Sequence, residues 1–325
     1  MNIKYENTGN KKTVKLNEPL ISIDNLEVKF INQDATIHAV NGVDIKLDKG
    51  KVLTILGESG SGKSVTMRSI LRLLPPKASL SGSIIVDGKN IIDMSQDQLS
   101  NMRGREVSMI FQEPMVAFDP VYKVGAQIAE TVVRHLGTSF NEGLARAKEL
   151  FDLVQIPSAK SRLSAYPHEL SGGMRQRAMI ALALACSPKL LLADEPTTAL
   201  DATVQIQILL LLRELQRELG MSIIFVTHDV GVATEIADDL AVMYAGKRPD
   251  KTLGGETFVF REEHLLALSL GGLVRLPWIY DGARVRVSKS RERGYWVSLR
   301  RRRDAGDEFY VRFVGVFGTV GERRV

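Results

Sequence analysis

The strongest constraint on the fold is the stretch from residue 52 to residue 74, VLTILGESGSGKSVTMRSILRLL. Its apolar start predicts a buried parallel strand, and the residues after the glycine-rich segment follow a helical period. In the pattern Gly-x-x-x-x-Gly-Lys-Ser, the glycines let consecutive backbone N–H groups turn inward on a phosphate chain. The flanking strand and helix disfavour the alternative, a plain Gly/Ser linker. The predicted phosphate-binding residues are Gly57, Glu58, Ser59, Gly60, Ser61, Gly62, Lys63 and Ser64.

Side chains at the ends of two segments predict the chemistry of the bound group. The Lys63 ammonium can reach the outer phosphates, and the Ser64 hydroxyl can ligate Mg²⁺. A second apolar run, KLLLADE at 189–195, ends in Asp194 and Glu195 at what we expect to be the same sheet edge. We expect Asp194 to hold Mg²⁺, directly or through water, and Glu195 to take a proton from an attacking water. The alternative is a surface turn before a helix that Asp201 caps.

Two further strands end in polar residues. The run SIIFVTHD at 222–229 brings His228 to the nucleotide end of the sheet, although a lone histidine is more often structural than catalytic. The run VSMIFQEP at 107–114 places Gln112 just past its apolar residues. Gln112 would be unremarkable without the other motifs.

A helical insert is predicted between about residue 115 and residue 172. Apolar residues recur at helical spacing in VGAQIAETVVRHL and NEGLARAKELFDLVQI, with Ser139 or Asn141 as a cap for the second helix. The insert ends at LSGGMRQRA, where Ser171, Gly172 and Gly173 begin a helix. Exposed N–H groups and the helix dipole there favour an anion, so the chain has a second predicted phosphate cradle.

These segments together resemble the ATP-binding subunit of ABC transporters across most of residues 20–247. The resemblance implies an α/β fold of the P-loop NTPase type, with a mixed sheet core, an antiparallel β subdomain and a helical subdomain. GESGSGKS corresponds to the Walker A loop, LLLADE to the Walker B strand, Gln112 to the Q-loop residue and His228 to the switch histidine. ATP and Mg²⁺ are the implied ligands, and the implied metal ligands are Ser64, Gln112 and Asp194.

The resemblance also gives roles to the remaining motifs. LSGGMRQRA would be the signature sequence, which closes on ATP held by the P-loop of another subunit. Ala199-Leu200-Asp201 would form the D-loop, and Phe30 would stack on adenine, although Phe30 could equally belong to the core. Lys63, Glu195 and His228 would be the residues that catalyse ATP hydrolysis.

A closer match is to the oligopeptide/dipeptide permease branch. It rests on LLADEPTTALDATVQIQILLLL, on FVTHDVGVATEIADDLAVMYAGK and on Met174. The branch implies import of peptides, or in some members of nickel or other solutes. The implied partners are a second ATP-binding subunit, which we expect to form a heterodimer with this chain, two membrane permease subunits and an extracellular substrate-binding protein. The chain would then be peripheral to the cytoplasmic face of the membrane.

Composition fits a globular chain of 325 residues with 44% hydrophobic residues. Its longest apolar runs, IQILLLL and MIALALAC, are shorter than the ~20 residues of a membrane span. The polar N-terminus predicts a flexible arm at 1–19 and no secretory signal. Cys186, the only cysteine, is compatible with a reducing compartment.

The segment 248–325 departs from the family pattern. It holds 16 Lys and Arg residues against 10 Asp and Glu residues, and 14 of the 16 are arginines, whereas the chain before it is nearly neutral. We therefore place a domain boundary at 247 and interpret 248–325 as an atypical Arg-rich tail, either a product of a shifted reading frame or an accessory domain. The tail also leaves open a second functional class, a soluble ABC-type ATPase acting on nucleic acid or ribosomes. A single nucleotide-binding domain and a nearly neutral body argue against nucleic acid as a partner.

Overall fold

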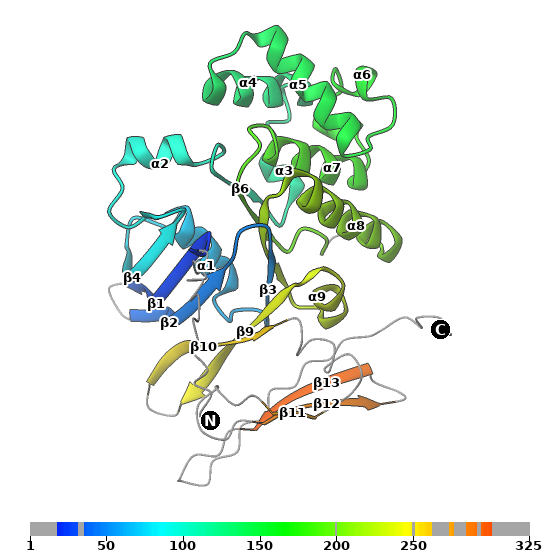
Figure 1. The fold of residues 1–325 in the computed structure, drawn as a ribbon. Helices are drawn as coiled ribbons and strands as arrows, with labels where there is room; N and C mark the ends of the chain where they lie inside the picture. The colour runs from blue at the N-terminus through cyan, green and yellow to red at the C-terminus, as the bar shows by residue number, and fades with distance from the viewer. Residues whose placement is uncertain are drawn as a thin grey trace, which may run out of the picture.

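The centre of the computed structural model is a six-stranded sheet with the order β10-β9-β3-β8-β7-β6 (Figure 1). The structure describes residues 18–31, 36–198, 200–248, 251–261, 273–275, 284–290 and 294–300. The strands from β9 to β6 are parallel, and β10 is antiparallel to β9. The bounds are β3 Val52–Gly57, β6 Val107–Ile110, β7 Leu190–Asp194, β8 Ser222–Thr227, β9 Asp239–Arg248 and β10 Lys251–Arg261. Because β3, β7 and β8 are buried along their length, their sequences are nearly continuous apolar runs.

A second, antiparallel sheet has the order β2-β1-β4-β5. Figure 1 shows it to the left of the central sheet, with α1 beside it. Its inward residues, among them Ile23, Val28 and Ile45, are buried, and many of the residues between them are exposed or half-buried, as expected for a sheet with one covered face. The bounds are β1 Ile21–Ile31, β2 Thr36–Leu47, β4 Ala78–Val86 and β5 Lys89–Asn90.

The helices divide between the sheets and the predicted insert. Helix α4 (Val124–Leu136) and α5 (Phe140–Leu153) pack against each other, and Figure 1 shows them with α6 at the top of the view. Of the two candidate caps for the second insert helix, Ser139 is the cap, since its side chain accepts a hydrogen bond from the Glu142 N–H. The other helices are α1 Lys63–Ile70, α2 Gln96–Met102, α3 Pro114–Ala117, α6 Ala159–Arg162, the 3₁₀ helix η1 Pro167–Glu169, α7 Gly172–Ala183, α8 Ala202–Leu219 and α9 Val230–Ile236.

Two hydrophobic clusters hold these parts together. One joins the helical segment to a face of the central sheet and includes Phe151 and Phe225, both fully buried. The other joins the antiparallel sheet to α1 and to the opposite side chains of the central strands, such as Ile55 and Ile224. The central sheet is therefore covered on both faces, as a parallel sheet requires. This arrangement confirms the predicted α/β fold with a mixed sheet, an antiparallel sheet and a helical part.

The described parts of the tail form strands. Strand β10 extends the central sheet past the boundary predicted at 247, and β9 itself ends one residue beyond it at Arg248. A separate three-stranded sheet consists of β11 Leu273–Arg275, β12 Arg284–Ser290 and β13 Gly294–Arg300. Residues 1–17 of the predicted arm lie outside the described residues. Within the described residues, none of the helices combines the length and the apolar character that a membrane crossing needs.

Candidate functional site

The loop between β3 and α1 has the backbone shape that its glycines predict. Gly62 has φ 96°, in the left-handed region, and a Cβ there would lie 2.5 Å from the Ala39 carbonyl oxygen. A Cβ on Gly57 would lie 2.5 Å from the Met243 carbonyl oxygen and 2.6 Å from Ser61 Oγ. The loop therefore passes too close to its neighbours for any other residue at these two positions.

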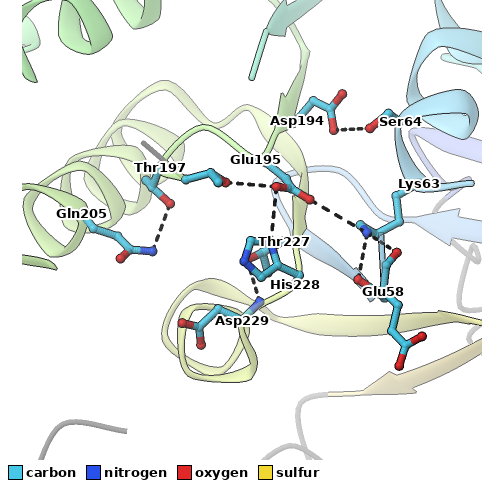
Figure 2. Close-up of polar contacts among 12 residues, drawn as sticks. Glu58, Lys63, Ser64, Asp194, Glu195, Thr197, Gln205, Thr227, His228 and Asp229 are labelled. Atoms are coloured by element: carbon cyan, nitrogen blue, oxygen red, sulfur yellow. Dashed lines mark hydrogen bonds and ion pairs between the residues drawn. The ribbon is translucent and has the colours of Figure 1, made fainter. Parts of the chain in front are cut away.

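Lys63 lies inside this loop. Its side chain is 4% exposed, and Nζ donates to the carbonyl oxygens of Gly57 and Glu58, each at 2.8 Å. An ammonium group has three hydrogens, so one remains for a ligand. Nζ also lies 3.9 Å from Oε1 of Glu195 (Figure 2). Burial lowers the pKa of Lys63, and the charges of Glu195 and Asp194 oppose this shift.

The loop fits a phosphate group. Ser61 Oγ is buried and, among the described residues, has no hydrogen-bond partner. Three residues of the loop, Glu58, Ser59 and Gly60, are exposed, and α1 begins directly after it. A buried hydroxyl without a partner, a free ammonium hydrogen and a helix N-terminus all favour an anion at one place.

Ser64 and Asp194, the two side chains expected to hold Mg²⁺, contact each other. Ser64 Oγ donates to Asp194 Oδ1 at 2.9 Å, although the two residues are 130 positions apart (Figure 2). Burial raises the pKa of Asp194, and the Ser64 hydrogen bond opposes this shift. A hydroxyl and a carboxylate are oxygen donors of the kind that Mg²⁺ prefers, and phosphate oxygens and water commonly complete such a site. These two residues therefore fit the implied Mg²⁺.

Glu195 is fixed at both its backbone and its side chain. Its backbone lies in the left-handed region at φ 47°, which is uncommon for a residue with a Cβ, and its N–H donates to the Val226 carbonyl at 3.1 Å. Its Oε2 accepts from Thr198 Oγ1 at 3.0 Å and lies 3.3 Å from His228 Nδ1. A non-glycine residue in this conformation at a site of polar groups is a candidate for function rather than for packing.

His228 follows β8 and faces Glu195, as Figure 2 shows. Its side chain is 57% exposed, so part of the ring is open to a ligand. The next residue, Asp229, caps α9 by accepting from the N–H groups of Gly231 and Val232, and its own N–H donates to Thr227 Oγ1. These bonds fix the backbone on which His228 stands.

Gln112 lies at the same edge of the sheet as Asp194. It follows the last residue of β6 by two positions, and that residue, Ile110, pairs with Ala193 of β7. Gln112 is exposed. Its role as a metal ligand is untested and remains a prediction.

The second predicted cradle also has an exposed start. Ser171 caps α7 by accepting from the Met174 N–H at 3.3 Å, and Ser171 and Gly172 are exposed. A Cβ on Gly173 would lie 3.1 Å from Val204 Cγ1, so this turn packs on the start of α8. Figure 1 shows α7 and α1 apart, so the two cradles do not enclose one anion within this chain.

Three other predicted residues have different outcomes. Asp201 caps α8 by accepting from the Val204 N–H at 3.0 Å, as predicted. Phe30 pairs with Ile37 and Ala78 in the antiparallel sheet and packs, half-buried, against the second hydrophobic cluster. It therefore contributes to the core, and its contact with adenine remains a prediction. Ala199 lies outside the described residues.

One residue of the site was missed from the sequence. Thr198 contacts Glu195 directly, and the only signal for it is a hydroxyl residue three positions after the glutamate in EPTT. Such spacing is typical of a local turn and by itself predicts no function.

The arrangement defines a class of protein. A parallel sheet carries a phosphate loop with a buried lysine, and a hydroxyl, two carboxylates and a histidine meet at the carboxyl edge of its strands. These are the parts of a P-loop nucleoside triphosphate hydrolase.

Comparisons with known proteins place the chain within that class. A family model described as ABC transporter matches residues 40–198. The oligopeptide transport ATP-binding protein OppD of Bacillus subtilis (strain 168) is 49% identical over 230 residues, which cover 70% of this chain and 64% of that protein. OppD of Haemophilus influenzae (strain ATCC 51907 / DSM 11121 / KW20 / Rd) is 47% identical over 229 residues, which cover 70% of this chain and 71% of that protein.

A solved structure gives the same answer for the fold. The dimeric, post-hydrolysis state of the ATP-binding cassette MJ0796, bound to ADP and phosphate, is 28% identical and superposes with a TM-score of 0.61 over 69% of this chain and 93% of that chain. The chain therefore belongs to the ABC transporter family of ATP-binding proteins, and the two relatives above are named as oligopeptide transport proteins.

Proposed function

We propose that this chain binds ATP with Mg²⁺ and hydrolyses it to drive an ABC importer of peptides. The observation that carries the proposal is the position of Glu195, whose carboxylate lies between the P-loop lysine and His228. The relatives named as oligopeptide transport proteins support peptides as the solute. They do not favour the alternative of a soluble ATPase that acts on nucleic acid.

In the proposed reaction, water attacks the γ-phosphate in line with the departing ADP oxygen. Glu195 accepts the proton of this water, since its carboxylate lies at the sheet edge beside the phosphate loop. Lys63 keeps two hydrogens on the loop carbonyls and turns the third to the phosphate, where its charge stabilises the developing negative charge. His228, whose Nδ1 lies beside Glu195, donates a hydrogen bond to the γ-phosphate from its other ring nitrogen, Nε2.

Three residues of the described site would hold the metal. Ser64 and Asp194 would hold Mg²⁺, with Gln112 as a third ligand, and the ion would supply positive charge that stabilises the negative charge of the phosphates. Ser64 Oγ and Asp194 Oδ1 lie 2.9 Å apart, close enough for one ion to contact both oxygens.

The exposed second cradle supports a partner subunit. Ser171 and Gly172 are exposed where α7 begins, and the related cassette bound to ADP and phosphate is dimeric. We infer that this cradle closes on ATP held by a second ATP-binding subunit, in a heterodimer. Gln112 and the helical segment would transmit closure to two permease subunits at the cytoplasmic face of the membrane, which receive solute from an extracellular binding protein.

The test of the chemical step is the substitution E195Q. We expect turnover of ATP to be lost, because an amide cannot accept the proton, while Mg·ATP binding is kept because the side chain has nearly the same shape. Phosphate release and equilibrium binding of a fluorescent ATP analogue measure the two properties separately. Turnover near the unmodified rate would contradict the assignment of Glu195 as the base.

The test of the solute is uptake in cells that lack the gene. We expect labelled oligopeptides to enter only when the unmodified gene is returned, and E195Q to serve as the matched inactive control. Peptide uptake that continues without the gene would remove peptides as the proposed cargo.

The origin of the Arg-rich tail is a separate question. We propose that residues after 247 arise from a shifted reading frame, because arginine replaces lysine abruptly there. Sequencing the locus and reading all three frames tests this. A sound frame through residue 325 would make the tail, including β10, a genuine extension of the domain.

A further inference from the structure

Three polar groups surround the carboxylate of Glu195. Lys63 Nζ lies 3.9 Å from Oε1, His228 Nδ1 lies 3.3 Å from Oε2, and Thr198 Oγ1 donates to Oε2 at 3.0 Å. The Lys63 distance exceeds that of a hydrogen bond. The Thr198 hydrogen bond is the shortest of the three contacts, and it holds Oε2, one of the two carboxylate oxygens of Glu195.

Two of these groups have other tasks once ATP is bound. In the proposed reaction, Lys63 turns its third hydrogen to the phosphate, and His228 donates to the γ-phosphate from Nε2. Thr198 has no such task. It belongs to the same turn as Glu195, because its N–H donates to the Glu195 carbonyl at 3.3 Å.

The turn itself is held from two sides. The Glu195 N–H donates to the Val226 carbonyl of β8, and the adjacent Thr197 is buried and accepts from Gln205 Nε2 of α8 at 3.2 Å (Figure 2). The backbone that carries Thr198 is thus fixed to the sheet and to α8. Its hydroxyl can keep its direction when the nucleotide changes the surroundings of Glu195.

We propose that Thr198 is a positioning residue, which holds Oε2 of Glu195 so that Oε1 faces the attacking water and accepts its proton. This rests on the proposed role of Glu195 as the base. Thr198 is exposed in the single chain, and closure of a second subunit would exclude water from this hydrogen bond and strengthen it. Its contribution should therefore appear in turnover rather than in ATP binding.

The experiment compares T198V, T198A and T198S with the neighbouring substitution T197V, which removes a hydroxyl that faces Gln205 and not Glu195. For T198V and T198A we expect kcat to fall roughly tenfold, the size of one lost hydrogen bond to a charged group, with KM for ATP within about twofold. We expect T198S, which keeps the hydroxyl, to recover most of kcat. T197V loosens the turn but keeps the Thr198 hydroxyl, so it should lower kcat less than T198V does, by about threefold at most.

Three results would overturn the proposal: an unchanged kcat in T198V and T198A, no recovery in T198S, or an equal loss in T197V. The last result would mean that the turn needs both hydroxyls for its shape. E195Q, assayed in parallel, separates this inference from the proposed function. If E195Q still hydrolyses ATP, Glu195 is not the base and the proposed function is contradicted. If E195Q is inactive and T198V is fully active, only the proposed role of Thr198 is contradicted.

Discussion

The ion pair between Arg213 and Asp238 gives the sharpest stability prediction. Asp238 is 7% exposed, both terminal nitrogens of Arg213 donate to its carboxylate, and Oδ2 also accepts from the Val52 N–H at 2.8 Å. These bonds join α8 to the starts of β3 and β9. Removing one member of a buried pair costs about 3–5 kcal/mol, and we expect the lower value in D238A because Arg213 also donates to Gln216.

A loss of about 3 kcal/mol corresponds to a fall in melting temperature of roughly 6–12 °C for a domain of this size. Thermal unfolding followed by circular dichroism at pH 7 measures it, with E214A as the control on an exposed acidic neighbour in α8. Replacing both partners by apolar residues, in R213M/D238L, should cost less than D238A because no charge is left without its partner. A melting temperature of D238A within about 2 °C of the unmodified protein would refute this reasoning.

Two further predictions concern the loop and a surface ion pair. G62A should lose ATP binding, because φ 96° is unfavourable for alanine and its Cβ would lie 2.5 Å from the Ala39 carbonyl oxygen, so the loop would have to move. Binding of a fluorescent ATP analogue measures this. G137A, at an exposed glycine, is the control. Hydrogen bonds from Lys189 and Lys49 lower the pKa of Asp87 in the folded protein to about 2. The Asp87 carboxylate therefore stabilises the fold fully above its unfolded pKa of about 3.9, and this stabilisation is lost as pH falls through about 2. Urea unfolding should therefore show D87N less stable than the unmodified protein at pH 7, with a smaller difference at pH 3; an equal difference at both pH values would contradict it.

Much of the site could be predicted because its parts are local. A strand, a glycine loop and a helix follow one another in the sequence around Lys63, so the loop geometry needs no distant partner. The contact of Ser64 with Asp194 was predictable because parallel strands bring their carboxyl ends to one edge. The caps at Ser139 and Asp201 depend on neighbouring residues alone.

The contacts that escaped prediction depend on tertiary structure. Arg213 and Asp238 are far apart in sequence from Val52, and no pattern in the chain links them. The pairing of β10 with β9 is set by the sheet edge rather than by the composition of the tail. Phe30 shows the same limit, because alternation places it on a strand but does not decide between the core and a ligand.

The most direct test of the account is a structure of the E195Q protein with Mg·ATP and its partner subunit. We expect the γ-phosphate within hydrogen-bond distance of Lys63 of one chain and of the turn at Ser171 or its equivalent in the other, with the metal at Ser64 and Asp194. An ATP molecule bound at the P-loop with the Ser171 turn still open to solvent in a closed dimer would contradict the shared site.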